Sequence, residues 1–216
     1  MSLRINSPAP NFEAGTTHGW INFHNWVGSS WAMLFSHPKD FTPVCTTELG
    51  RLAALEPEFA ARGTKVIGLS ADPVSRHKDW EKDIEAALGH AVTYPIIADP
   101  DLVIAKLYGM LPEGMGDPRN PADSTPVRSV FLVSPDKRIR ASLTYPNEVG
   151  RNFDEVLRVV EACQLAAKFS LATPVDWHHG SDVIIPLYLS DEEAKVKYPD
   201  GWKAPLPYLR LVPDPS

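Results

Sequence analysis

Cys45 is the residue of this 216-residue chain whose surroundings point most directly to chemistry. It lies in the stretch 36–49, where a short apolar segment gives way to a helical pattern. Thr42 is a suitable N-cap and Pro43 a suitable first helical residue, which would place Cys45 at the third helical position. The helix dipole and the free backbone N–H groups there favour negative charge. We therefore expect a thiolate, the nucleophilic form of cysteine.

The alternative interpretation of Cys45 is an inert buried cysteine, the commoner fate of an isolated cysteine. The capped start of the helix favours the reactive interpretation. Cys163, the second cysteine, falls on the apolar stripe of a predicted helix, where burial is expected. Two cysteines without a Cys-x-x-Cys pair supply no disulfide framework and no zinc-ligand set, which favours a reducing compartment.

The elements that must position Cys45 follow an α/β pattern, in which short apolar segments alternate with helical ones. Predicted buried strands are Trp31–Phe35, Lys65–Ser70, Tyr94–Ala98 and Ser129–Val133. Arg138–Tyr145 alternates apolar and polar residues, as a half-exposed strand does. Predicted helices are Pro43–Arg62, Val74–Leu88, Asp101–Tyr108 and Asn152–Lys168, and Glu113–Pro126 is predicted to be a loop.

The composition changes near residue 172, after which seven of the 21 prolines fall within the last 45 residues. We therefore predict a main domain over residues 1–168 and a small proline-rich region over 169–216. Asp191–Tyr198 is predicted to be a short helix introduced by Ser190. A disordered tail is the alternative, and the aromatic residues of this region weaken it.

The motif Pro38-x-x-x-Thr42-x-x-Cys45 resembles the active-site signature of peroxiredoxins, thiol peroxidases built on a thioredoxin-like sheet. Further blocks resemble the one-cysteine, peroxiredoxin-6-like class of that family. These blocks are SHPKDFTPVCTTELGRL, Val127-Arg128, Tyr145-Pro146, Gly150-Arg151-Asn152-Phe153 and Ala172-Thr173-Pro174-Val175-Asp176-Trp177. The resemblance therefore runs almost from end to end.

This resemblance implies a thioredoxin-like α/β fold, a central mixed β-sheet flanked by helices, with a small C-terminal extension. It implies reduction of hydrogen peroxide and alkyl hydroperoxides through Cys45, which becomes a sulfenic acid. Since this class has no intramolecular resolving cysteine, an external thiol or other reductant would complete the cycle. The chemistry needs no cofactor and no metal, and the seven histidines are scattered along the chain.

The resemblance also assigns roles around the sulfur. Thr42 would offer its hydroxyl to the peroxide, Pro38 would shield the pocket, and Arg128 would stabilise the thiolate and polarise the O–O bond. Taken alone, an arginine is more often a surface charge. Supporting positions are His37, Glu48 and Arg151.

Two competing functions stay open. Ser30, His24 and Asp136 match the positions of an accessory calcium-independent phospholipase-type acyl hydrolase in some relatives. However, the segment Gly28-Ser29-Ser30-Trp31-Ala32 has Ala where the nucleophile elbow G-x-S-x-G has its last Gly. The other alternative is a redox-signalling or chaperone module, which need not turn over with a small reductant.

Charge and hydropathy exclude further classes. A net charge of -6 and a pI near 5.6 argue against nucleic-acid binding. The longest apolar run, Trp31–Phe35, is far too short to span a bilayer, and the first fifteen residues show no signal peptide. We therefore expect a cytoplasmic protein without integral membrane association. The resemblance implies a homodimer or a larger oligomer.

Overall fold

The computed structural model describes residues 3–113 and 125–216. The chain forms two compact units, Met1–Phe153 and Asp154–Ser216. Most of the predicted loop Glu113–Pro126 lies outside the described residues. None of the described helices combines the length and the apolar character needed to cross a membrane.

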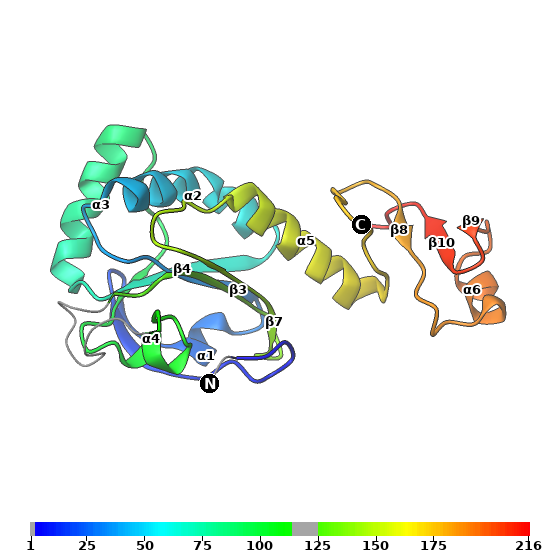
Figure 1. Ribbon diagram of the computed structural model, residues 1–216, viewed down its shortest axis with the longest axis horizontal. Coiled ribbons are helices and arrows are strands. Elements are labelled where there is room, and N and C mark those ends of the chain that lie inside the picture. Colours follow the sequence, from blue (N-terminus) through cyan, green and yellow to red (C-terminus); the bar gives the residue numbers. More distant parts are fainter. Residues whose placement is uncertain (1–2, 114–124) are drawn as a thin grey trace. The chain divides into compact units, whose positions relative to one another are not determined.

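A seven-stranded mixed sheet forms the centre of the first unit, in the order β2-β1-β5-β4-β3-β6-β7 (Figure 1). Parallel pairing joins β3 to β4 and β4 to β5, and the other neighbours are antiparallel. The strands are β1 Glu13–Thr16, β2 Gly19–Asn22, β3 Trp31–Ser36, β4 Thr64–Ser70, β5 Ile96–Ala98, β6 Arg128–Val133 and β7 Ile139–Tyr145. All five predicted strands are therefore confirmed within two residues at each end.

The β1–β2 hairpin was not predicted, because its strands are four residues long and carry glycine instead of a clear apolar alternation. The start of β5 also differs from the prediction. Pro95 has no N–H to donate, although its carbonyl accepts a 2.9 Å hydrogen bond from the N–H of Gly68. The regular strand therefore begins only after it.

The helices of the first unit are α1 Phe23–Val27, α2 Pro43–Ala61, α3 Val74–Leu88 and α4 Val103–Leu107. Three of them confirm predicted helices, whereas α1 was not predicted. The helix α4 is shorter than the predicted Asp101–Tyr108. Its start is set by Asp99, whose carboxylate accepts hydrogen bonds from the first three backbone N–H groups of the helix.

The sheet has a helix layer on each face, with α2 and α3 on one side and α1 and α4 on the other (Figure 1). Because side chains alternate along a strand, Leu34 of β3 joins the α1–α4 core, whereas Phe35 points to the other face. There the Phe35 ring packs edge-on against Tyr94, whose hydroxyl donates to Leu49 O in α2. This packing fixes α2 at the end of β3.

The second unit contains most of α5 Phe153–Phe169, and also α6 Asp191–Lys197 and a three-stranded antiparallel sheet. The strands β8 Val183–Ile184, β9 Lys203–Leu206 and β10 Leu209–Val212 pair in the order β8-β10-β9. Trp177 is 2% exposed within an apolar cluster of this unit. The predicted helix at 191–198 is confirmed, with a capping box between Ser190 and Glu193. The region is therefore folded, with a core of its own.

Candidate active site

Cys45 lies in the first turn of α2, at the third helical position, as predicted. Thr42 is extended, with φ −118° and ψ 146°, and its carbonyl accepts a 2.9 Å hydrogen bond from Thr46 N–H. Pro43 then opens the helix. The Cys45 side chain is completely buried. The first turn therefore presents one sulfur to a closed environment near free backbone donors.

Arg128, the first residue of β6, lies against this sulfur. Its Nη1 donates to Cys45 Sγ at 3.3 Å, and the arginine is only 3% exposed. Nε and Nη2 donate to the Asn147 carbonyl at 3.0 and 2.7 Å, which fixes the plane of the guanidinium. A fixed positive charge at this distance stabilises a thiolate over a thiol.

Ser36 explains why Arg128 is placed so firmly. Its hydroxyl donates to the Val127 carbonyl at 2.6 Å and accepts from the Ser129 N–H at 3.1 Å. The residues on both sides of Arg128 are therefore tied to the end of β3. β3 leads into the loop before α2, which carries Cys45. Ser36 therefore links the strand that precedes Cys45 to the strand that begins with Arg128.

Glu48 follows Cys45 by three residues, which puts both side chains on the same face of α2. Its Oε2 accepts from Arg128 Nη1 and from Arg151 Nη2, each at 2.7 Å. Its Oε1 accepts from Arg151 Nε at 2.9 Å and from the Arg151 backbone N–H at 2.7 Å. Burial alone would raise the pKa of Glu48, but the hydrogen bonds and charge of Arg151, with the charge of Arg128, lower it overall. Glu48 is therefore an ionised, buried link between two arginines.

Arg151 also joins this network to the sheet. Its Nη1 donates to the carbonyls of Ser36 and Ser129 at 2.9 and 3.0 Å. The guanidinium lies 5.2 Å from the centres of the Phe35 and Phe153 rings, within cation–π range. The structure thus brings together Cys45 and the three charged residues that the resemblance named. An arginine taken alone is more often a surface charge, but both Arg128 and Arg151 are buried.

Pro38 and Thr42 lie in the loop between β3 and α2, and both are half-buried. The Thr42 hydroxyl donates to the Lys39 carbonyl at 2.9 Å and does not cap α2. Its lone pairs are still available to accept a hydrogen bond. The peroxide-binding role of Thr42 and the shielding role of Pro38 stay predictions.

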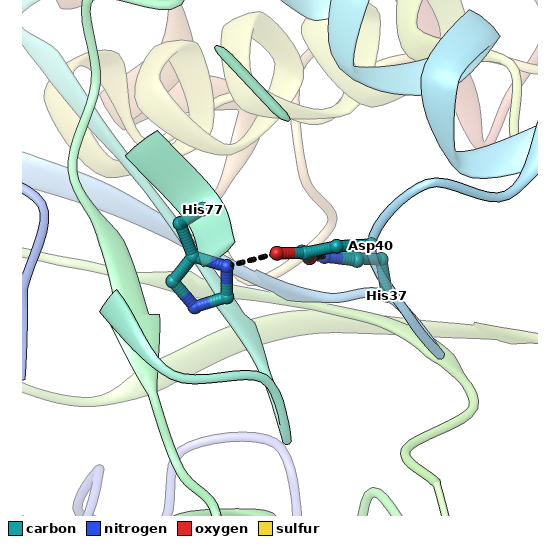
Figure 2. Close-up of side chains that lie close together, drawn as sticks. All are labelled: His37, Asp40 and His77. Atoms are coloured by element: carbon teal, nitrogen blue, oxygen red, sulfur yellow. Dashed lines mark hydrogen bonds and ion pairs between the residues drawn. The ribbon is translucent and has the colours of Figure 1, made fainter. Parts of the chain in front are cut away.

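His37 pairs with Asp40, and the structure adds a second histidine that the sequence did not suggest (Figure 2). His37 Nε2 lies 2.8 Å from Asp40 Oδ1, and His77 Nδ1 lies 2.6 Å from Asp40 Oδ2. Ligand atoms of these three residues lie within 4.8 Å of one another and could hold a metal ion. Because the facing atoms already satisfy one another, a hydrogen-bonded cluster explains them without one. Among the described hydrogen bonds, none joins His37 to Cys45.

The three hydrolase candidates each have other partners. His24 Nε2 lies 2.8 Å from the Ala9 carbonyl. The Asp136 carboxylate accepts hydrogen bonds from Ser134 and Arg140. Ser30, His24 and Asp136 are all described, and no hydrogen bond joins any two of them. The charge relay that would activate Ser30 is therefore not formed in this structure.

Cys163 belongs to α5 and is half-buried, so the predicted burial is only partial. No disulfide joins the two cysteines. Two features of the site had no sequence signal. The Asn147 acceptor is a backbone carbonyl, and the Asp40–His77 pair joins residues 37 positions apart.

Comparison with known proteins identifies the family of this chain. Residues 5–142 match the AhpC/TSA family, and residues 162–201 match the C-terminal domain of 1-Cys peroxiredoxin. The chain is 47% identical to a 1-Cys peroxiredoxin of Dictyostelium discoideum, over 99% of this chain and 86% of that protein. It is 50% identical to Peroxiredoxin-6 of Rattus norvegicus, over 99% and 98% of the two chains.

Solved structures show the same similarity. The C45S mutant of Peroxiredoxin 6 of Arenicola marina superimposes with a TM-score of 0.91 at 43% identity, covering 100% of both chains. A yeast mitochondrial 1-Cys peroxiredoxin gives a TM-score of 0.88 at 45% identity, covering 98% of this chain and 99% of that one. Both confirm the thioredoxin-like α/β fold and support the peroxidase interpretation over the hydrolase alternative. The chain belongs to the AhpC/TSA family and, within it, to the 1-Cys peroxiredoxins, thiol-dependent peroxidases.

Proposed function

We propose that Cys45 is the peroxidatic nucleophile of this thiol peroxidase. The thiolate attacks one oxygen of the hydroperoxide, the S–O bond forms, and the O–O bond breaks. The sulfur becomes a sulfenic acid, and the departing oxygen takes a proton from water to give water or an alcohol. The observation that carries the proposal is the 3.3 Å contact between Arg128 Nη1 and Cys45 Sγ in a fully buried setting.

The surrounding residues stabilise charge, hold Arg128 in position, contact the peroxide and exclude water. Arg128 stabilises the thiolate and then the negative charge that develops on the departing oxygen. Glu48 and Arg151 hold that guanidinium in position. Thr42, whose hydroxyl lies at the start of α2, contacts the peroxide, and Pro38 keeps water from the sulfur. None of these steps requires a cofactor or a metal.

The sulfenic acid is reduced by an external thiol. The yeast relative is described as resolved through glutathione/thioredoxin systems, and we extend a thiol reductant of this kind to the present chain. Without it, a second peroxide would convert Cys45 to sulfinic acid and inactivate the enzyme.

The protein acts as a homodimer or a larger oligomer in the cytoplasm. The edge strand β7 supports a partner chain. β6 is the only named strand that pairs with it in the described sheet, and on its other side the N-terminal segment forms backbone hydrogen bonds with Ile139 alone, so the rest of this edge favours pairing. Size-exclusion chromatography with light scattering tests the oligomer: a monomer at micromolar concentration would contradict it. Fractionation of the native host tests the location.

Mass spectrometry after one equivalent of hydrogen peroxide tests the nucleophile. We expect one added oxygen on the peptide that contains Cys45, removed by glutathione or thioredoxin. Stopped-flow measurement of peroxide consumption then separates an enzyme from a redox-signalling or chaperone module, since only an enzyme turns over repeatedly. Turnover that survives Cys45→Ser would refute the assignment.

A further inference from the structure

Arg76, in the first turn of α3, has a guanidinium that the fold uses only in part. Its Nε lies 3.0 Å from Asp72 Oδ1, as an ion pair. Its Nη1 and Nη2 have no hydrogen-bond or ion-pair partner among the described residues, and the side chain is 43% exposed. The N–H groups of these two nitrogens lie in one plane, the geometry that binds both oxygens of a carboxylate. This edge of the guanidinium is therefore available to an anion from solution.

Phe41 holds this guanidinium in place. Arg76 Cζ lies 4.9 Å from the centre of the Phe41 ring, within cation–π range. Phe41 is 43% exposed and takes a left-handed conformation, with φ 56°, which a bulky residue keeps only where its surroundings hold it. Asp72, the ion-pair partner of Arg76, also accepts a 2.8 Å hydrogen bond from the Asp40 N–H in the same loop. Arg76 and Phe41 thus form one fixed surface, which we call the rim.

The rim lies beside the turn that carries the reacting sulfur. Phe41 directly precedes Thr42 and is four residues before Cys45, so the Cα atoms of Phe41 and Cys45 are at most about 14 Å apart. The Phe41 ring lies 6.2 Å from the ring of Trp80, whose Nε1 donates to the Thr46 hydroxyl. Cys45 itself is completely buried. A molecule that approaches the sulfur past this loop therefore contacts the rim first.

The charge at the rim differs in sign from the charge of the whole chain. A net charge of -6 disfavours the approach of an anion to the protein as a whole. The loop between β3 and α2, however, exposes Lys39, two residues before Phe41. Asp72 is buried, and its two oxygens already face Arg76 and the Asp40 N–H. The exposed charges of the rim and its loop are therefore positive.

The reductant is the reactant that such a rim fits. Every catalytic cycle consumes a thiol, whereas hydrogen peroxide has no anionic group for Arg76 to bind. A peptide thiol of the glutathione type carries carboxylates at both ends, and a chain of three residues spans about 10 Å, the scale of the separation between rim and sulfur. We propose that Arg76, held on Phe41, binds a carboxylate of the reductant and thereby selects a small anionic peptide thiol. The inference rests on the proposed function, because a reductant is needed only if Cys45 becomes a sulfenic acid.

Arg76 takes no part in the redox chemistry itself. The thiolate of the first reductant molecule attacks Cys45 Sγ, so that an S–S bond forms and the S–O bond breaks. The leaving hydroxide takes up the proton that the thiol released and becomes water. A second thiolate then attacks the reductant's sulfur in this mixed disulfide, which releases the Cys45 thiolate and the disulfide of the reductant. Arg76 holds the first molecule near the sulfur and is a specificity-determining residue.

The unaltered protein gives the first test. Cys45 is oxidised with one equivalent of hydrogen peroxide, and mass spectrometry follows loss of the added oxygen after mixing with glutathione or with its dimethyl ester, in which both carboxylates are neutral. The rates are compared at equal thiolate concentration, because esterification changes the pKa of the thiol. We expect glutathione to react about tenfold faster, the effect of one charge-assisted pair at a half-exposed site. Equal rates would overturn the proposal without any variant.

Arg76→Gln tests the residue. We expect the rate with glutathione to decrease about tenfold and the rate with the ester to change less than twofold. Arg76→Lys keeps the charge without the planar donors and should retain part of the preference for glutathione. Lys78→Gln removes the same charge from an exposed neighbouring position of α3 and should match the unaltered protein. If Arg76→Gln slows glutathione and ester equally, Arg76 only supports the structure of the loop, and the proposal is wrong.

A carboxylate on the hydroperoxide is the competing explanation. The reduced protein is therefore also mixed with a fatty-acid hydroperoxide and with its methyl ester. A preference for the free acid that Arg76→Gln removes, without any effect on glutathione, would assign the rim to the peroxide and overturn the proposal. Peroxide turnover in Cys45→Ser would instead refute the proposed function, whereas loss of thiol selectivity alone leaves Cys45 as the nucleophile.

Discussion

Glu48→Gln tests the buried charge network most directly. The Glu48 carboxylate accepts four hydrogen bonds, one from Arg128 and three from Arg151, at 2.7 to 2.9 Å. Glutamine has the same shape and keeps one acceptor oxygen. Its NH₂ group, however, is a donor and cannot accept hydrogen bonds from the guanidinium groups. Loss of two charge-assisted hydrogen bonds predicts a decrease of about 3–5 kcal/mol in the free energy of unfolding.

Glu58→Gln is the matched control for Glu48→Gln, since it makes the same substitution in the same helix. Glu58 is 56% exposed and pairs with Arg62, and an exposed pair contributes about 0–1 kcal/mol. Urea unfolding followed by circular dichroism measures both variants, with equal slopes as the condition for comparing free energies. If Glu48→Gln costs no more than Glu58→Gln, the network does not stabilise the fold as argued.

The stabilisation by Glu48 also depends on pH. Its folded pKa lies below its unfolded value, so its contribution is complete above the unfolded pKa of about 4.3 and is lost as pH falls through the folded value. The stability difference between the unaltered protein and Glu48→Gln should therefore be large at neutral pH and shrink in acid. A difference that grows toward low pH would contradict the assignment.

Four further variants test separate parts of the molecule. Arg128→Lys keeps the positive charge but loses the planar guanidinium, whose separate N–H groups reach the Cys45 sulfur and the Asn147 carbonyl. Stopped-flow measurement should therefore show the reaction with peroxide slowed about 100-fold. Cys45→Ser should abolish peroxide consumption while Cys163→Ser keeps turnover with an external thiol; inactivity of a folded Cys163→Ser would refute the one-cysteine cycle. Trp177→Ala should destabilise the second unit by about 3–5 kcal/mol, seen as faster proteolysis of residues 170–216, and unchanged cleavage would show that its core does not depend on this ring.

The sequence predicted the parts of the fold that rest on local patterns. Long apolar strands and the Thr42-Pro43 start of α2 were placed correctly, because each depends on neighbouring residues alone. The β1–β2 hairpin and α1 were missed, since four or five residues are too few for a periodic signal. The start of α4 moved because the Asp99 carboxylate caps it and Leu102 takes a left-handed conformation, with φ 56°.

The site residues were less predictable from local sequence patterns than the strands and helices were. No local pattern distinguishes Arg128 from a surface arginine, and its role came from the family resemblance. The resemblance in turn did not include the Asn147 carbonyl that fixes this guanidinium, nor the Ser36 hydroxyl that ties β3 to β6. These contacts join residues far apart in the chain, so they depend on the pairing of strands.

The charge balance around the sulfur explains why these distant contacts matter for reactivity. Arg128 and Arg151 carry two positive charges and Glu48 one negative charge, which leaves one positive charge unpaired in a buried place. A buried charge is costly unless an opposite charge accompanies it. Cys45 Sγ lies in contact with Arg128, so a thiolate at this atom would supply the charge. On the proposed role of Cys45, the charge on the sulfur is therefore coupled to the folded network, and we expect any change that removes Glu48 or either arginine to alter stability and reactivity together.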